Sequence, residues 1–168
     1  MKELVTTRLW LRPIGVAEAR SVAAGVPGAG SAWAPGYPAV SDIVAVGGYL
    51  EHRDAAGDPR PFGHYQLVRR ADGLTIGGAG FHGPPGERCD VTIGYGVIPA
   101  ARRSGYATEA LRALLDFARV RGVALVHGTA ERANDASQRV MTAVGMVLVG
   151  EDHANRHYAI GWGGQPEG

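Results

Sequence analysis

Hydrophobic residues with a helical period mark the clearest element of this chain. Six small or apolar positions recur along it, the later five lying 3, 4, 7, 8 and 11 residues after the first: Ala107, Ala110, Leu111, Leu114, Leu115 and Ala118. Such spacing places all of them on one face of an α-helix. Gly122 follows shortly afterwards and is typical of a helix end. The pattern predicts an amphipathic helix over about residues 107–118.

Apolar runs separated by turn residues predict strands on both sides of this helix. Ala71-Asp72-Gly73 is typical of a tight hairpin turn, and residues 83–87 form a second predicted turn. The strands are expected over residues 9–11, 64–70, 74–81, 89–98, 124–129, 146–150 and 157–162. The antiparallel part of the sheet therefore begins with a predicted hairpin meander.

Three further helices complete the expected order of elements. An Ala-rich segment predicts a helix over residues 16–25, and residues 135–144 predict another. Between them, Ser41-Asp42 is predicted to provide the N-cap of a helix that continues through Leu50. The Pro- and Gly-rich segment 26–38 is expected to be a loop. The order β-α-α-β-β-β-α-β-α-β-β predicts an α+β fold with a mixed sheet and helices on its faces.

Length and composition favour a single globular domain over residues 1–168. Seventeen basic residues against 16 acidic ones give a formal charge of +1, which does not support binding to nucleic acid or to a membrane surface. A single cysteine, Cys89, excludes an internal disulfide and a thiolate zinc site. No signal peptide or membrane-spanning run is evident, so we expect a cytoplasmic location.

The segment between the last residue of a predicted strand and the strongest helix has the character of a phosphate site. It reads Val97-Ile98-Pro99-Ala100-Ala101-Arg102-Arg103-Ser104-Gly105-Tyr106-Ala107-Thr108. Small residues at positions 104, 105 and 107 allow a phosphate to approach the backbone, and unpaired N–H groups in the first helical turn favour a bound anion. Arg102 and Arg103 add positive charge. The alternative is a Gly-containing loop that only turns the chain.

Two other motifs do not predict sites. Residues 78–83 match the dinucleotide pattern G-x-G-x-x-G, but Pro84-Pro85 follows and no helix begins there. His153 and His157 are four residues apart without a helical pattern around them, so we expect ordinary hairpin polarity and no bound metal.

Three motifs in order resemble the GNAT superfamily of N-acetyltransferases. Arg102-x-x-Gly105-x-Ala107, opening a helix after a strand, is similar to the acetyl-CoA motif of that family. Ile93-Gly94-Tyr95 with Pro99 resembles the preceding strand in the RimJ/RimL-like branch, which acetylates the N-termini of ribosomal proteins. Asn134-x-x-Ser137, followed by Arg139, Val140 and Gly145-Met146, resembles the second signature of the branch. The resemblance covers about residues 64–162, and residues 7–13 fit the usual first strand.

The resemblance implies a GNAT fold and a site for acetyl-CoA as co-substrate. The fold would be a mixed, mostly antiparallel sheet of about seven strands, with helices on both faces and a splay between the two central strands near Val97. Backbone groups of Val97 and Ile98 would bind the pantetheine arm, one N–H polarising the thioester. The pyrophosphate would be held beside Arg102 by backbone amides of Arg103, Ser104, Gly105, Tyr106, Ala107 and Thr108. Asn134 would contact the pantetheine or cap a helix, or do both, and Arg139 would reach the 3′-phosphate.

The resemblance also implies catalytic residues, with alternatives. Many family members use a Tyr seven residues after the motif Asn, but Met141 occupies that position, so Ser137 is expected to assist the departing thiolate. Its alternative role is that of a first-turn helix Ser. Thr92 replaces the Glu that often precedes the Ile-Gly-Tyr run, so Asp90 on the same strand face is the expected base. His82 and Glu87 are other candidates for the base.

The acceptor side is the least specified part of the site. Trp33 and Tyr37 lie in the loop where the family builds its acceptor pocket, and His82 is a further residue expected to bind the acceptor. The alternative is that the two aromatic residues anchor the loop to the core. The expected activity is direct acetyl transfer in a ternary complex to a protein N-terminus or a small-molecule amine. A non-catalytic acyl-CoA sensor and a transferase for a longer acyl-CoA remain alternatives. The protein is expected to be a monomer or a homodimer.

Overall fold

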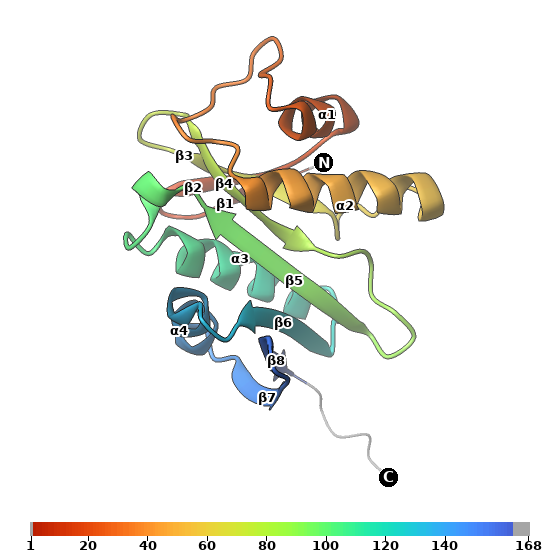
Figure 1. Ribbon diagram of the computed structural model, residues 1–168. Coiled ribbons are helices and arrows are strands. Elements are labelled where there is room, and N and C mark those ends of the chain that lie inside the picture. The colour runs from red at the N-terminus through yellow and green to blue at the C-terminus, as the bar shows by residue number, and fades with distance from the viewer. Residues whose placement is uncertain (1, 163–168) are drawn as a thin grey trace.

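The computed structural model describes residues 2–162, which form one eight-stranded sheet with helices on both faces (Figure 1). The strands are Leu4–Val5 (β1), Leu9–Pro13 (β2), His64–Arg69 (β3), Thr75–Phe81 (β4), Asp90–Val97 (β5), Leu125–Glu131 (β6), Val147–Glu151 (β7) and Asn155–Gly161 (β8). The helices are Val16–Ala24 (α1), Val40–Ala56 (α2), Tyr106–Val120 (α3) and Asp135–Ala143 (α4), with a short 3-10 helix over Pro99–Ala101 (η1). The predicted α+β class is confirmed, and β1 is an additional strand.

The sheet divides between β5 and β6. Its strand order is β1-β2-β3-β4-β5-β6-β8-β7, and every neighbouring pair is antiparallel except β5 with β6. The parallel pairing begins at Asp90 with Leu125 and ends at Thr92 with His127. Beyond these residues the two strands diverge, so the predicted splay is confirmed and starts well before Val97.

Helices cover the two faces of the sheet in pairs. Helices α1 and α2 pack together on one face, where α2 contacts β3 and β5 and crosses in front of the sheet in Figure 1. Helix α3 lies behind the sheet in the same view, and α4 packs beside it and against β6. The residues of α3 that the structure buries are Ala110, Leu111, Leu114, Leu115 and Ala118. The helical period in the sequence therefore identified the face that packs on the sheet.

The predicted start of α2 is wrong. The helix begins at Val40 with Ala39 as its N-cap, so Ser41 and Asp42 lie inside the first turn. The Asp42 carboxylate accepts a hydrogen bond from the Ala39 N–H at 2.8 Å. This is the reach-back half of a capping box, in which an acidic residue at the third helical position satisfies the N–H of the cap. In the sequence, an acidic residue at the third helical position therefore resembles an acidic N-cap residue.

The core is continuous through the sheet and both helical layers. None of the helices within residues 2–162 is long and apolar enough to cross a membrane. The predicted single domain also includes residues 1 and 163–168, which lie outside the described residues.

Candidate functional site

The divergence of β5 from β6 leaves one edge of β5 open. The Ile98 N–H donates to the Ile76 carbonyl at 2.8 Å, and the His82 N–H donates to the Thr92 carbonyl at 2.9 Å. Successive residues of a strand direct their backbone groups to opposite edges, so Tyr95 and Val97 direct theirs toward β6. The pairing with β6 has already ended at Thr92, and these groups face the gap.

Val97 and Ile98, whose backbone groups are both expected to bind the pantetheine arm, differ in this respect. The Val97 N–H points to the open edge and is available to a ligand. The Ile98 N–H is bonded to β4 and is not available, so the expectation for that group is corrected. The reason is the strand alternation, which presents only every second residue on the open edge.

The turn into α3 carries a series of unpaired N–H groups. Among residues 2–162, no backbone or side-chain oxygen accepts a hydrogen bond from the N–H groups of residues 103–108. Arg103 and the N-cap Gly105 both have positive φ, at 62° and 79°. The turn and the first helical turn thus present consecutive donors beside the partial positive charge of the helix end. The residues expected to bind a pyrophosphate are brought together.

Arg8 supports this turn from a distant part of the sequence. Its Nη1 donates to the Ser104 carbonyl at 2.7 Å, and its Nε donates to Glu109 Oε2 at 2.7 Å. The guanidinium also lies 4.3 Å from the centre of the Tyr106 ring. Glu109 accepts further hydrogen bonds from the hydroxyl of Thr6 and the N–H of Arg8. The sequence carries no signal for this support, because β2 and α3 meet only in the folded chain.

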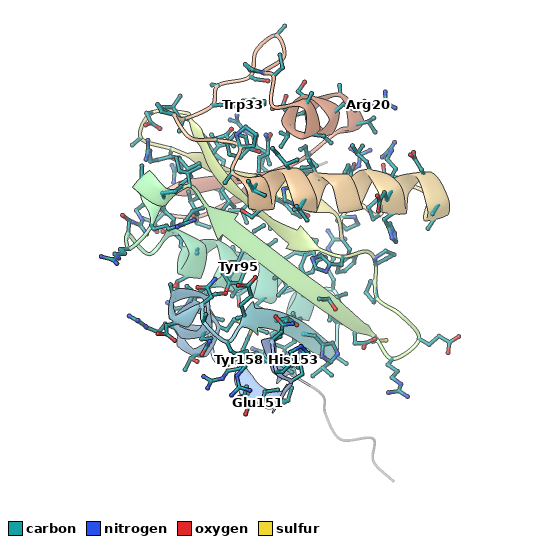
Figure 2. All side chains as sticks on the ribbon, in the orientation of Figure 1. Arg20, Trp33, Tyr95, Glu151, His153 and Tyr158 are labelled. Atoms are coloured by element: carbon teal, nitrogen blue, oxygen red, sulfur yellow. The ribbon has the colours of Figure 1, made fainter. Side chains whose placement is uncertain are left out.

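Tyr95 crosses the gap and contacts the start of α4, and Figure 2 places it between β5 and α4. Its hydroxyl lies 2.8 Å from Ser137 Oγ and donates to the Ser137 carbonyl at 2.9 Å. Burial raises the pKa of Tyr95, so the phenol keeps its proton at neutral pH. Asn134 caps α4, since its side-chain oxygen accepts the Ser137 N–H at 3.1 Å. In the sequence Tyr95 is recognisable only as part of a motif, and no local pattern predicts its pairing with Ser137.

A cavity of about 620 Å³ lies between α2 and the strands β4 and β5. Polar groups of its wall come from α2, from β3 and from the segment after β4: Ser41, Asp42, Tyr49, His52, His64 and His82. Tyr95 belongs to the wall as well. The cavity therefore meets the β5–β6 gap at Tyr95, the residue that contacts Ser137.

Glycines open the sheet side of this cavity. Gly78, Gly80, Gly94 and Gly96 all line it, on paired positions of β4 and β5. A Cβ on Gly78 would lie 2.5 Å from His64 Nε2, and one on Gly94 would lie 3.0 Å from His82 Nε2. The glycines that imitate a dinucleotide motif in the sequence thus make room for side chains on the cavity wall.

Two buried titratable groups face the cavity. Asp42 is 3% exposed, and burial raises the pKa of its carboxyl to about 6 against the opposing hydrogen bond from Ala39. His64 is 8% exposed, and burial, with His82 nearby, lowers the pKa of its imidazole to about 4. At neutral pH the cavity wall therefore carries a carboxylate and a neutral imidazole.

Other predicted site residues lie elsewhere. Asp90 pairs with His127 at 3.2 Å at the far end of β5 from Val97, and it is not part of the cavity wall. Glu87 is exposed in the connection before β5. Trp33 donates to Glu18 at 3.0 Å, and Tyr37 is buried against Gln66. These contacts match the alternative of core anchors, and neither aromatic residue lines the cavity.

Arg102 and Arg103 are exposed in the turn before α3, and Arg139 is exposed in the middle of α4. Arg102 Nε lies 3.4 Å from the Val97 carbonyl, while Arg139 lies within α4, two residues after Ser137. Within residues 2–162 there is no cluster of three or more His, Cys, Asp or Glu that could hold a metal ion.

Comparison with known proteins identifies the family. The acetyltransferase (GNAT) domain matches residues 8–147. The uncharacterized N-acetyltransferase YjdG of Bacillus subtilis (strain 168) is 29% identical over 98 residues, which are 58% of this chain and 58% of that protein. The matched region therefore spans little more than half of that curated relative.

Solved structures show the same fold at low identity. The ribosomal-protein-S5-alanine acetyltransferase from Vibrio fischeri has a TM-score of 0.69 and 13% identity, over 96% of this chain and 97% of that one. RimL, a ribosomal L7/L12 alpha-N-protein acetyltransferase in complex with coenzyme A, has a TM-score of 0.66 and 15% identity, over 95% and 98% of the two chains. With the divided sheet, the open edge of β5 and the domain match, these findings show that the chain belongs to the GNAT acetyltransferase family.

Proposed function

We propose that the protein transfers the acetyl group of acetyl-CoA to a primary amine by direct attack in a ternary complex. The observation that carries the proposal is the meeting of two spaces at Tyr95. The open edge of β5 and the unpaired turn before α3 lie on one side, and the cavity under α2 lies on the other. A thioester in the gap and an amine in the cavity would therefore come together beside β5.

The residues on the co-substrate side fit a long, anionic thioester. The N–H groups of residues 103–108 and the adjacent Arg102 would hold the pyrophosphate. The open edge of β5 would pair with the pantetheine arm as another strand does, and the side-chain amide of Asn134, whose oxygen caps α4, would contact the same arm. Arg139 is assigned to the 3′-phosphate. The RimL relative, solved with coenzyme A, supports this choice of co-substrate.

The Val97 N–H and the Tyr95–Ser137 pair supply the groups that transfer needs. The Val97 N–H faces the gap and can stabilise the negative charge that develops on the thioester oxygen. Ser137 Oγ, hydrogen bonded to Tyr95, can donate to the departing thiolate. Asp90, which pairs with His127 away from the cavity wall, is not part of the proposed mechanism.

The proposed acceptor is a protein N-terminus or a small-molecule amine. Relatives that act on ribosomal proteins favour the first, and the size of the cavity is compatible with either. The proposal includes a cytoplasmic location and a monomeric or homodimeric state.

Two measurements test this proposal: calorimetry with acetyl-CoA, and the release of CoA in the presence of a broad panel of amines. We expect acetyl-CoA to bind and at least one amine to release CoA faster than water does. Acetyl-CoA binding without turnover would favour the non-catalytic sensor. Faster release from propionyl- or butyryl-CoA would favour the transferase for a longer acyl group. Failure to bind any acyl-CoA would contradict the proposal.

A further inference from the structure

Asp42 and His64 are two buried hydrogen-bond acceptors at one point of the cavity wall. A Cβ on Gly78 would lie 2.5 Å from His64 Nε2 and 3.3 Å from Asp42 Oδ1, so both atoms lie close to this glycine, which lines the cavity with them. The two residues come from different elements: Asp42 lies on α2 and is 3% exposed, and His64 lies on β3 and is 8% exposed. Their convergence is a property of the tertiary structure.

Both groups have unused hydrogen-bonding capacity. Of the buried side-chain nitrogen and oxygen atoms in residues 2–162, His64 Nε2 is one without a hydrogen-bond partner. The Asp42 carboxylate makes its hydrogen bond to Ala39 through Oδ2, which leaves Oδ1 directed at the cavity. Leaving a buried polar atom unpaired is costly, so such an atom aimed into a cavity indicates a ligand that completes its bonding.

The charge of the wall restricts the ligand. Asp42 is the single Asp, Glu, Lys or Arg among the described residues that line the cavity, and no Lys or Arg balances it. The wall is otherwise apolar or neutral, with Val44, Ala45 and Phe81 among its residues. A carboxylate or phosphate on the ligand would therefore meet like charge without a compensating cation.

Resting on the proposed function, we propose that this cavity binds its acceptor as an ammonium ion held by Asp42 and His64. The acceptor class is a primary amine with an apolar body and no acidic group beside the nitrogen. Asp42 Oδ1 accepts one N–H, and His64 Nε2 accepts a second in the tautomer that carries its proton on Nδ1. This class includes a peptide N-terminus, whose carbonyl carbon is amidated, and excludes free amino acids.

The same two residues then account for the protons of the reaction. The ammonium gives one proton to Asp42, which passes it to solvent, and the freed lone pair forms the C–N bond to the acetyl carbon. The C–S bond breaks, and its electron pair leaves with sulfur, which takes a proton delivered through Ser137. The amine nitrogen loses its second proton to His64, which passes it to solvent. Solvent in turn replaces the proton that sulfur received through Ser137. The balance is an amide, a thiol and one proton released.

Calorimetry with matched ligands tests the proposal without relying on turnover. The probes are phenethylamine, hexylamine and phenylalaninamide, each compared with phenylalanine, and each is titrated with and without saturating CoA. We expect at least one of the three amines to bind and phenylalanine to bind at least about tenfold more weakly, because of its carboxylate. Equal affinity for phenylalanine, or no binding by any of the three amines, would overturn the proposal. Binding of CoA itself is observed separately, so a failure of the proposed co-substrate is not confused with a failure here.

Variants identify the atoms responsible. Asp42→Asn keeps an oxygen for the Ala39 N–H but removes the charge, and it should weaken amine binding at least about tenfold. Asp54→Asn, an equal charge change on the exposed side of α2, should leave binding unchanged. Amine affinity that is the same in both variants would refute the role of Asp42.

A second pair of variants keeps the test independent of helix capping. Gly78→Ala places a methyl group that overlaps the His64 imidazole and lies 3.3 Å from Asp42 Oδ1; the ring must shift, and amine binding should be abolished. Gly47→Ala adds a methyl group to α2 that meets nothing within 4 Å and serves as its control. Thermal unfolding confirms that each variant is folded. Undiminished amine binding by folded Gly78→Ala protein would place the amine elsewhere and overturn the proposal.

Discussion

The Tyr95 hydroxyl and Ser137 Oγ lie 2.8 Å apart and connect β5 to α4 across the divided part of the sheet. The same phenol donates to the Ser137 carbonyl at 2.9 Å, so the Ser137 hydroxyl is left to donate to the phenol oxygen or to a ligand. An incoming thioester sulfur would compete with Tyr95 for that proton. The pair therefore combines a structural contact across the gap with a proton donor for the reaction.

Ser137→Ala should lower kcat and kcat/KM together while acetyl-CoA affinity stays nearly constant. The reason is that the thiolate develops only in the transition state, and general-acid contributions are about 10²- to 10⁴-fold. Steady-state CoA release with any accepted amine measures the change. Ser21→Ala, which removes a hydroxyl bonded within α1, is the control. Turnover of Ser137→Ala within about threefold of the wild type, far below that range, would exclude Ser137 from the mechanism.

Tyr95→Phe should separate the two roles of the pair. Removing the phenol breaks both contacts with Ser137, which frees the Ser137 hydroxyl but no longer positions it. We expect turnover to fall by about tenfold, less than in Ser137→Ala, with a loss of about 1 kcal/mol in the free energy of unfolding. Kinetics and urea unfolding on the same preparations measure both. A larger loss of turnover than in Ser137→Ala would identify Tyr95 as the proton donor instead.

Gly105→Ala should weaken acetyl-CoA binding by about tenfold, because the added methyl group lies against the Arg8 guanidinium that supports the turn carrying the donors. Gly105 has φ at 79°, and its added Cβ would lie 3.3 Å from Arg8 Nη2. Gly122→Ala is a matched control, with φ at 80° and no atom within 4 Å of the added Cβ. Both variants should lose about 1 kcal/mol of stability from the left-handed backbone. Calorimetry that shows equal acetyl-CoA affinity for the two would refute the pyrophosphate assignment.

Arg139→Ala should weaken CoA binding by about tenfold but leave dephospho-CoA binding nearly unchanged, if this guanidinium contacts the 3′-phosphate. Arg103→Ala should weaken both ligands alike, since its turn is the proposed site of the pyrophosphate, which both ligands carry. Arg119→Ala, an exposed Arg near the other end of α3, is the control. Equal losses for both ligands in Arg139→Ala would move the 3′-phosphate to another residue.

His64 should make the folded protein sensitive to acid. Its folded pKa of about 4 lies below the ordinary value of 6.5, so the unfolded chain binds a proton that the folded protein does not. Its contribution to the free energy of unfolding is complete above about pH 6.5 and is lost as the pH falls toward 4, by up to about 3 kcal/mol. The stability difference between wild type and His64→Gln, measured by urea unfolding, should fall by about this amount across that range.

The comparison of wild type with His64→Gln also controls for the other titratable groups around the cavity. Burial raises the pKa of Asp42 to about 6, so its own contribution changes in the opposite direction, with stability lost as the pH rises through that value. Asp42, His52 and His82 around the cavity are present in both proteins, so their effects largely cancel in the difference. His153→Gln, at an exposed turn, should show no such trend. A His64→Gln difference that is independent of pH would mean that His64 is not held neutral.

Local patterns in the sequence predicted most of the elements and the turn before α3. The period of α3, the hairpin at Ala71-Asp72-Gly73 and the small residues before α3 depend on neighbours along the chain, and the structure places all three as expected. The start of α2 was predicted wrongly because an Asp at the third helical position, which accepts the N–H of the N-cap residue, is as typical of a helix start as an Asp at the N-cap itself. The short strand β1 was missed because two residues carry too little pattern.

What the sequence by itself determined is therefore the family, the order of the main elements and the glycine-containing turn before α3, because each depends on motifs of adjacent residues. The tertiary structure decided which groups meet. It pairs Tyr95 with Ser137, supports Ser104 with Arg8 and brings Asp42 and His64 together above Gly78, while Asp90, Trp33 and Tyr37 lie outside the cavity wall. These relationships depend on strand register, on the alternation of backbone groups along β5 and on the close approach that glycine permits, and each is set by packing between segments far apart in the chain.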